Sequence, residues 1–269
     1  MTAKPIEVVG TAVTAGCYKC RLSTTNMLIR GFMAGLYIAV GGALATICAT
    51  DIVSPGITKL VLGAVFPVGL IAIVLTGMEL FTGDAMIGPM AAMRKKVKWM
   101  AVMKLWLFVY IGNFVGSIFW AYLMATTSLT GNTGDPNVYG QFAMKIAAFK
   151  VAYGDIGGFM AFWKPFMSGI ACNLLVNVAI LLSFSSKNMI GKFFGIWFPI
   201  MAFVSSGFEH CVANMYFIPA GIFLGAAGVT WGNFFMANLI PVTLGNIVGG
   251  FFFIGVVYYM TFKDEFPKE

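Results

Sequence analysis

Six long apolar stretches constrain the fold of this chain more than any other feature of the sequence. They are residues 27–50, 60–92, 105–128, 161–185, 193–225 and 233–262. Each is long enough for a helix of about 20 residues, which crosses the hydrocarbon core of a bilayer. Because the apolar runs are continuous and do not alternate with polar residues, the pattern excludes an outer-membrane barrel. We therefore predict an all-α integral membrane protein with six transmembrane helices.

The basic residues indicate the membrane topology. Only 10% of the residues are charged, and the formal net charge is +7. If the N-terminus is cytoplasmic, the outer side carries only Lys59, Lys145, Lys150 and Lys164, and the remaining lysines and arginines lie inside. This asymmetry follows the positive-inside rule, so the charge reflects topology and not a nucleic-acid partner. We expect a multi-pass protein of the inner (plasma) membrane, surrounded by lipid, with both termini in the cytoplasm.

The sequence divides into a short leader, one membrane domain and a tail. The expected parts are a cytoplasmic leader with a short interfacial helix (1–26), a single six-helix transmembrane domain (27–262) with halves near 27–128 and 161–262, and a cytoplasmic tail (263–269). Because the leader is polar, we expect no cleavable signal peptide. A long segment with many glycines joins the two halves, and we expect a short helix near residues 140–150 within it.

Three short motifs each occur twice, in the same order and about 130 residues apart. The pairs are F-M-A-G at 32–35 and F-M-S-G at 166–169, [T/S]-G-x-E at 76–79 and 206–209, and G-N-x-V-G at 112–116 and 245–249. We interpret the paired glycines of the third motif as faces that allow close helix packing. Each half contains three spans, and since three is odd, the second half must enter the membrane from the opposite side. The sequence therefore predicts a 3+3 inverted repeat.

Glycine and proline interrupt the second and fifth spans. Both spans carry a Phe-Pro pair, at 66–67 and 198–199, and a glycine two residues before the repeated glutamate. Irregular backbone at membrane depth is tolerated only inside protein or beside a water-filled cavity. In inverted repeats the substrate path runs between the halves, along such broken helices. We therefore expect helices 2 and 5 to be broken and to line a path.

Two ionisable residues lie together in the fifth span, within S-S-G-F-E-H-C-V-A-N-M at 205–215. They are Glu209 and His210, the single histidine of the chain. An ionisable residue inside a membrane costs about 3 kcal/mol, so it is a functional candidate by default. A buried structural role is the competing interpretation for His210, but the repeat and the break favour a role in the path. For Glu209, and for Glu79 in the first half, we expect a structural role as acceptors for backbone donors freed at the breaks.

Three segments resemble the signatures of the formate/nitrite transporter family. They are E-L-F-T-G at 79–83, G-F-E-H-C-V-A-N-M at 207–215 and N-L-I-P-V-T-L-G-N at 238–246. The resemblance covers essentially the whole chain. It implies an aquaporin-like protomer of six helices, assembled as a homopentamer in which every protomer has its own pore. It also implies that the substrates are small monovalent anions or their acids.

The resemblance assigns roles to individual residues. It implies that His210 lies at the centre of the pore, with Thr82 as its partner and Asn173 facing the same pore. It implies a lysine at the pore vestibule, for which Lys150 is the match. The spacing to the glycine of the second F-M-S-G motif is longer than usual, so Lys145 and Lys164 stay open as alternatives. Two apolar constrictions are also implied, one from Phe66, Leu70 and Phe203 and the other from Leu80 and Phe81.

The residues agree with the transport of weak-acid anions. A charged anion cannot cross an apolar ring without a large desolvation cost. A lysine at the entrance raises the local anion concentration, and histidine is the side chain whose unperturbed charge changes near neutral pH. The hypothesis is that the anion is protonated, or paired with a protonated His210, as it crosses, with Thr82 and Asn173 bonding its oxygens. Formate is the expected substrate, and nitrite and hydrosulfide are the alternatives.

Other classes of protein fit the sequence less well. A water or glycerol channel shares the inverted plan but needs two Asn-Pro-Ala turns, and an ammonium channel typically uses two histidines. A membrane-embedded enzyme is the competitor of another class, but one histidine cannot build a multi-histidine metal centre and no nucleophile–base pair is evident. Cys17 and Cys20 have the spacing of half a zinc site or of a redox pair, and no second pair completes it. We therefore expect a transporter without metal or cofactor, and not an enzyme.

Overall fold

The computed structural model describes residues 2–266, which form helices and turns with one isolated β-bridge between Thr2 and Ser186. Within this described part of the chain, six helical segments are long and apolar enough to cross a membrane, which confirms the predicted fold class. They are Thr24–Ala49, Pro55–Thr76, Trp99–Ala125, Gly158–Ser185, Met189–Ser206 and Trp231–Glu265. Residues 267–269 of the expected cytoplasmic tail, with Lys268, lie outside the described residues.

Among residues 2–266, four of these segments are single helices, and the other two are divided into shorter helical elements. The single helices are α2 (Thr24–Ala49), α6 (Trp99–Ala125), α8 (Gly158–Ser185) and α9 (Met189–Ser206). Pro67 separates α3 (Pro55–Val65) from α4 (Val68–Thr76), as expected for a residue that cannot donate a helical hydrogen bond. The last span comprises α11 (Trp231–Asn233), the π-helix η2 (Phe234–Leu239), α12 (Ile240–Val248), the π-helix η3 (Gly249–Val256), α13 (Val257–Phe262) and η4 (Lys263–Glu265).

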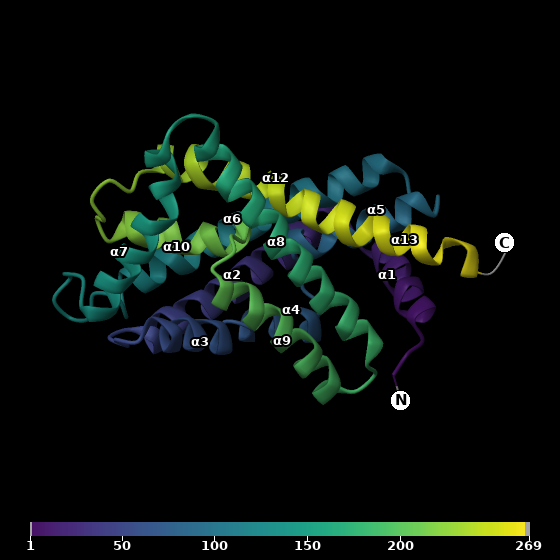
Figure 1. Cartoon of the computed structure of the whole chain (residues 1–269), viewed down its shortest axis with the longest axis horizontal. Coiled ribbons are helices and arrows are strands. Elements are labelled where there is room, and N and C mark those ends of the chain that lie inside the picture. Colours follow the sequence, from purple (N-terminus) through teal and green to yellow (C-terminus); the bar gives the residue numbers. More distant parts are fainter. Residues whose placement is uncertain (1, 267–269) are drawn as a thin grey trace.

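Each half also begins with a short helix outside its spans. These helices are α1 (Pro5–Cys20) and α7 (Val138–Val151), and α7 is followed by the 3-10 turn η1 (Ala152–Ile156). Figure 1 shows α1 near both termini at one end of the long axis and α7 at the opposite end. The first packs on the half-helix α5 (Phe81–Met93) and the second on the half-helix α10 (Cys211–Phe223). The repeated unit is therefore one helix longer than the sequence motifs indicated.

The second and fifth spans are broken at the repeated S/T-G-x-E motif, as predicted. Helix α4 ends before Gly77, whose φ of 74° is left-handed, and α5 begins at Phe81. Helix α9 ends before Gly207, whose φ is 77°, and α10 begins at Cys211. Glycine adopts a left-handed φ at little steric cost and commonly ends a helix in this way. In each half a glycine therefore stops the first segment and the chain resumes as a half-helix.

Two asparagines of the G-N-x-V-G motif satisfy the backbone groups that the breaks release. In the first half, the Asn113 Oδ1 atom accepts from the Phe81 N–H at 3.0 Å. Its Nδ2 atom donates to the carbonyls of Gly31 at 2.8 Å and Glu79 at 3.0 Å. Within a membrane each unpaired backbone group would cost several kcal/mol, so this side chain makes the break tolerable.

The second half repeats the arrangement with Asn246. The Oδ1 atom of Asn246 accepts from the Cys211 N–H at 2.9 Å, and its Nδ2 atom donates to Gly169 at 2.8 Å and Glu209 at 3.0 Å. The same three kinds of bond therefore hold both breaks. The asparagine gives the G-N-x-V-G motif a second role, in addition to the close helix packing that its glycines predicted.

The first repeated motif pairs in a different register from the one that the sequence suggested. Gly31 lies against Gly112, and Gly169 lies against Gly245. Since Gly112 and Gly245 are equivalent members of the third motif, the counterpart of Gly169 is Gly31 and not Gly35. The F-M-A-G and F-M-S-G match is displaced by one helical turn. Sequence could not reveal this, because residues four apart lie on the same helix face.

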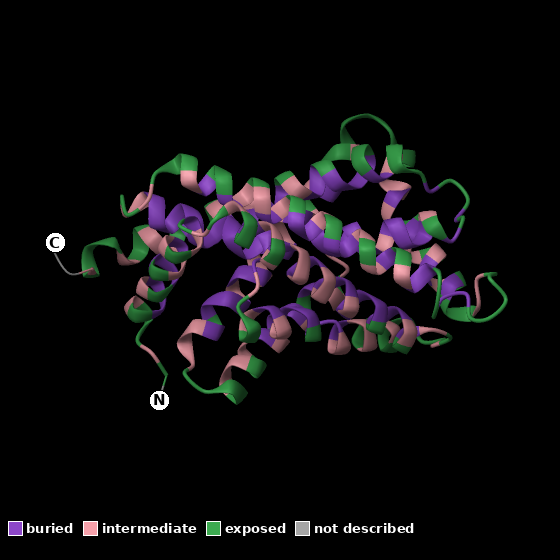
Figure 2. Cartoon of the chain, turned by 180° about the vertical axis from the view of Figure 1, so that it is seen from behind, coloured by how far each residue is buried: buried purple, intermediate pink, exposed green. Residues whose placement is uncertain are grey.

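The half-helices lie deep inside the protein. Figure 2 shows buried residues running through the middle of the molecule, with exposed residues concentrated on its outer faces and loops. Thr82 and Asp84 on α5 and Asn214 on α10 each have 0% exposure, and Glu79, Glu209 and His210 have 1–2%. Burial of these polar side chains requires that they pair with one another or with the backbone.

A side chain at Gly116 should destabilise the protein, because α2 and α6 meet backbone to backbone there. A Cβ atom at this position would collide with the carbonyl oxygen of Phe32, and overpacking of this kind costs about 1–3 kcal/mol. We expect Gly116→Ala to lower the melting temperature in detergent solution. Gly56→Ala is the matched control, since no atom lies within 4 Å of a Cβ built there. Equal melting temperatures for the two variants would contradict the close packing.

Removal of the asparagine amide should weaken the fifth-span break. Asn246→Ala leaves the Cys211 N–H and the Gly169 and Glu209 carbonyls without this partner, and each buried group left unpaired costs about 1–3 kcal/mol. We expect a lower melting temperature than that of Asn132→Ala, a control in an exposed loop. Matching unfolding curves for the two variants would show that water or other groups replace the amide.

Candidate functional site

Two cavities approach the broken helices, one beside α1 and the other beside α7. The first, termed the Lys19 vestibule, has a volume of about 250 Å³. The second, termed the Lys150 vestibule, has a volume of about 260 Å³. Among the described residues none lines both cavities. The lining of the first includes Lys19, Arg30, Leu70, Glu79 and Leu80, and that of the second includes Lys59, Phe66, Lys145, Lys150, Phe203, Glu209 and His210.

Thr82 and His210 join the two breaks at the centre of the protein. The Thr82 Oγ1 atom lies 2.9 Å from the His210 Nε2 atom, although the residues are 128 positions apart. Thr82 lies in the first turn of α5, and His210 is the N-cap of α10. The two half-helices therefore point their N-terminal ends, where the helix dipole is positive, toward one shared pair. The resemblance implied that these two side chains are partners, and they are in contact in the structure.

The hydrogen bonds of His210 determine its tautomer. The Ala213 N–H donates to the His210 Nδ1 atom at 3.1 Å, so this nitrogen carries a lone pair and no proton. In the neutral ring the proton then lies on Nε2, which donates to the Thr82 Oγ1 atom. The Thr82 hydroxyl proton is left available for another acceptor. A second proton on the ring would have to displace the bond that caps α10.

The apolar residues divide between the two vestibules differently from the expected constrictions. Phe66 and Phe203 line the Lys150 vestibule, and their ring centroids are 5.9 Å apart in an edge-to-face arrangement. The Phe203 ring is stacked on His210 at 5.8 Å. Leu70, expected beside these phenylalanines, lines the Lys19 vestibule together with Leu80. Apolar side chains therefore lie on both sides of the central pair.

Phe81 lies apart from both vestibules. Its ring centroid is 4.8 Å from that of Tyr110 and 6.1 Å from that of Trp106. These residues line an apolar groove between α6 and the last span. The side chain at the first position of α5 is directed away from Thr82, which follows it, because successive helical residues are rotated by about 100°. Phe81 thus packs against α6, in place of the constriction that the resemblance implied.

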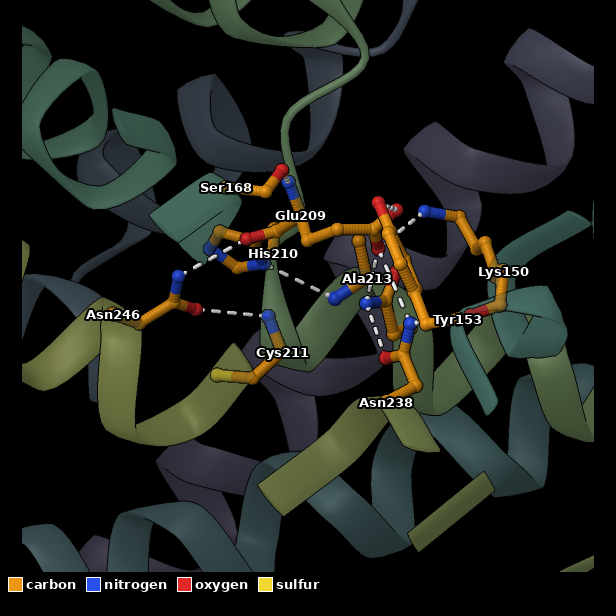
Figure 3. A network of polar contacts seen from close by, with 10 residues as sticks. Lys150, Tyr153, Ser168, Glu209, His210, Cys211, Ala213, Asn238 and Asn246 are labelled. Carbon is orange, nitrogen blue, oxygen red and sulfur yellow. Dashed lines mark hydrogen bonds and ion pairs between the residues drawn. The ribbon is translucent and has the colours of Figure 1, made fainter. Parts of the chain in front are cut away.

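Lys150 and Glu209 form the centre of a polar network in the Lys150 vestibule (Figure 3). The Lys150 Nζ atom lies 2.8 Å from the Glu209 Oε2 atom. Asn214 also donates to this oxygen, at 2.6 Å, and the Tyr153 hydroxyl donates to Oε1 at 3.4 Å. Burial, together with the Glu209 carboxylate, raises the pKa of Tyr153 above its ordinary value, so the phenol stays protonated and can donate. Asn238, on the π-helix η2, accepts from Asn214 at 2.7 Å.

Lys19 and Glu79 occupy the corresponding places in the Lys19 vestibule. The Lys19 Nζ atom lies 2.7 Å from the Glu79 Oε2 atom and 3.0 Å from the Asp84 Oδ1 atom. Arg30 approaches the other Glu79 oxygen at 3.6 Å. Lys19 lies near the end of α1 and Lys150 near the end of α7, so the equivalent short helices each supply one lysine.

The glutamates therefore have a different role from the predicted one. Both lie at the breaks, as expected, but Glu79 and Glu209 bind lysines, whereas Asn113 and Asn246 take the freed backbone donors. A carboxylate has no donor, so it could satisfy only the N–H groups of a break, whereas an amide satisfies N–H and C=O together. This geometry explains why the amide, and not the acid, bridges each break.

Asn173 binds the backbone of Thr82. Its Nδ2 atom donates to the Thr82 carbonyl at 3.0 Å and to the Asn246 carbonyl at 2.6 Å, while its Oδ1 atom has no hydrogen-bond partner among the described residues. Gly250 provides the space, because a Cβ there would lie 2.6 Å from this amide nitrogen. In the first half the large and small residues are exchanged. Gly35 stands in place of Asn173, and Ser117 stands in place of Gly250 and donates to the Gly35 carbonyl at 3.0 Å.

Of the candidate vestibule lysines, Lys150 and Lys145 line the cavity, and Lys59 joins them from α3. Lys164 is exposed and lines neither vestibule. The residues that sequence reasoning missed are Lys19, Arg30, Tyr153 and Asn238. An alignment of α1 with α7 at the offset of the other motifs would have identified Lys19, since it ends its helix as Lys150 does.

The cysteines of the leader carry no evident chemistry. Cys17 and Cys20 are both free thiols on α1. Burial raises the pKa of the Cys20 thiol to about 12, which disfavours the reactive thiolate. Within residues 2–266 no group of three or more His, Cys, Asp or Glu side chains is placed to hold a metal ion.

Comparisons with known sequences and solved structures find similar channels and transporters. The family model described as formate/nitrite transporter matches residues 6–260. A probable formate transporter of Methanothermobacter thermautotrophicus is 45% identical over 252 residues, which cover 89% of this chain and 90% of that protein. Among solved structures, a pentameric formate channel with formate bound has a TM-score of 0.75 and 32% identity, covering 89% of this chain and 98% of that one.

A second solved structure, described as an FNT family ion channel, has a TM-score of 0.84 and 27% identity, and the match covers 94% of this chain and 98% of that one. The similar proteins are channels and transporters, which favours transport over the membrane-enzyme alternative. The family match extends over nearly all described residues and includes both breaks and the central pair. The chain therefore belongs to the formate/nitrite transporter family.

Proposed function

We propose that this chain transports small monovalent weak-acid anions, with formate as the leading substrate and nitrite and hydrosulfide as the alternatives. The observation that carries the proposal is the Thr82–His210 pair, which joins two broken helices between apolar side chains. The choice of formate is supported by the similarity to a formate channel with formate bound and to a probable formate transporter.

The proposed path runs from the Lys150 vestibule to the Lys19 vestibule through the centre of the protomer. From the first cavity it passes Phe66 and Phe203 and reaches the Thr82–His210 pair. It then passes Leu70 and Leu80 and enters the second cavity. Lysines attract the anion into each vestibule, whereas the apolar side chains exclude a bare charge.

The geometry favours protonation of the substrate over protonation of His210. An imidazolium would need a proton on Nδ1, where the Ala213 N–H already donates. We infer that the neutral ring keeps this cap and that the Thr82 hydroxyl donates to an oxygen of the passing substrate. The anion takes a proton from hydronium in a vestibule, which leaves water, and the neutral acid can then cross the apolar side chains. Asn173 contributes by fixing Thr82, in place of the direct bond to the substrate in the hypothesis drawn from the sequence.

The assembly and orientation complete the proposal. We propose a homopentamer, with a path in each protomer, because the similar formate channel is pentameric. We also propose an inner-membrane location with both termini in the cytoplasm, which would place the Lys19 vestibule on the inner side. In this arrangement residues 27–262 act as one transmembrane domain, and α1 lies at the inner surface.

The function is tested by swelling of proteoliposomes that contain the purified protein. We expect swelling in sodium formate and none in glycerol, because glycerol is larger and has no charge for the lysines to attract. Swelling in glycerol alone would indicate a neutral-solute channel. Parallel measurements with nitrite and hydrosulfide rank the three substrates.

His210→Asn should reduce formate flux at every pH without changing the shape of the pH profile, because the ring keeps its neutral form in the proposed path. Asparagine is a good N-cap, so the variant keeps a side-chain acceptor for the start of α10 while it loses the imidazole. Loss of the central hydrogen bond should lower the flux by about tenfold. The measurement is formate flux into liposomes over a range of pH. If both proteins conduct identically at every pH, the histidine has no role in transport.

Lys150→Gln should raise the formate concentration that gives half-maximal flux, on the order of fivefold, since one positive charge beside the entrance is lost. Lys164→Gln is the matched control, because this lysine lines neither vestibule. High salt should reduce the difference between the two variants, as expected for screening. A larger effect of the control would assign the vestibule charge to Lys164.

A further inference from the structure

We infer that Asp84 makes the two vestibules electrically unequal, so that the protein captures its anionic substrate more strongly from the Lys150 side than from the Lys19 side. This inference rests on the proposed function and adds to it a residue that determines sidedness. It concerns the strength of anion capture at each mouth and not the central pair.

The inverted repeat allows a direct comparison of the two polar clusters. Lys19 and Lys150 occupy equivalent places, and so do Glu79 and Glu209, with each lysine within 2.8 Å of its glutamate. The fourth residue of each half-helix differs. It is Asp84 on α5 and Asn214 on α10. One half thus carries a carboxylate where the other carries a neutral amide of nearly the same shape.

The side chains that surround Asn214 and Asp84 also differ in charge. Asn214 donates to Glu209 at 2.6 Å and to Asn238 at 2.7 Å, so neutral amides surround the single carboxylate of that cluster. Asp84 instead accepts from Lys19 at 3.0 Å. Lys150 therefore pairs with one carboxylate, whereas Lys19 pairs with two.

The charges in and directly beside the vestibules are therefore unequal. The described lining of the Lys150 vestibule contains three lysines and one carboxylate, and Lys59 is the third lysine, from α3. The described lining of the Lys19 vestibule contains Lys19, Arg30 and Glu79, and the buried Asp84, which does not line the cavity, contacts the lysine. The lining of the first cavity therefore has a formal charge of +2, whereas that of the second has a formal charge of +1, which falls to zero when Asp84 is counted with the lysine that it contacts.

Two features offset the cost of burying a negative charge at Asp84. It lies in the first turn of α5, where the positive end of the helix dipole stabilises an anion. Its Oδ1 atom is also in contact with the Lys19 ammonium group. With a buried carboxylate in this place, Lys19 attracts a passing anion less strongly than Lys150 does.

The consequence for transport is a difference in half-saturation between the two sides. An anion at the Lys150 mouth meets excess positive charge, while an anion at the Lys19 mouth does not. A passive path cannot favour one direction at equilibrium, so the side with the lower half-saturating concentration must also have the lower maximal flux. Both quantities can be measured separately from each side.

The test compares the wild-type protein with Asp84→Asn, which copies Asn214 into the equivalent position. Formate flux is measured in vesicles of known protein orientation, with formate added on either side. In the wild type we expect the half-saturating concentration to be lower on the Lys150 side, by on the order of fivefold. Asp84→Asn should lower the value on the Lys19 side more than on the other, and so reduce the ratio. High salt should reduce the wild-type ratio, which a purely structural role of Asp84 would not explain.

Two further variants keep the test decisive. Asn214→Asp should raise the half-saturating concentration on the Lys150 side, and it serves if Asp84→Asn does not fold. Asp264→Asn removes an exposed acid of the C-terminal segment, which lies at the same end as α1 and lines neither vestibule, and should leave the ratio unchanged. Equal half-saturation on both sides of the wild type, or a ratio that neither vestibule variant alters, would overturn the inference. Absence of anion flux through the wild type would instead overturn the proposed function.

Discussion

The structure depends on the need to satisfy backbone hydrogen bonds where a helix is interrupted inside a membrane. An interruption releases N–H and C=O groups that hydrocarbon cannot serve. Asn113 and Asn246 meet this need with one side chain per break, each accepting from one N–H and donating to two carbonyls. Because an amide has both donors and an acceptor, it is the side chain suited to this bridge. The positions of the half-helices, and hence of the groups at their N-terminal ends, follow from these bonds.

Much of the architecture could be predicted from the sequence. Hydropathy gave the six spans, the repeated S/T-G-x-E motif located the breaks, and the isolated Glu209–His210 pair identified the centre. These features are local, and each is encoded in a few consecutive residues. The register of the first motif was wrong by one turn, because glycine occupies the same helix face in both registers. The contacts of Phe81 were missed because they depend on the packing of α6, which no short motif encodes. Lys19 was missed because the repeat was not extended to α1 and α7, which each carry a lysine in the last turn.

The central histidine combines structural and chemical roles that the sequence presented as alternatives. Its Nδ1 atom caps α10, and its Nε2 atom meets Thr82 from the other half. The cap fixes the tautomer, so the backbone of α10 decides which ring nitrogen faces the partner. Substitutions at this position therefore change both helix stability and the central hydrogen bond, and asparagine is the replacement that separates the two effects.

The exchange of large and small residues between the halves limits how this protein can be rebuilt. Asn173 faces Gly250 in one half, while Gly35 and Ser117 occupy the matching places in the other. A protein made from two identical copies of the first half would have no amide behind its threonine, and two copies of the second would lack both that threonine and a partner for the imidazole. The two halves of the repeat are therefore complementary, as the two different subunits of a heterodimer are, although one chain contains both. The backbone keeps the symmetry of the repeat, but the central site requires different side chains from the two halves.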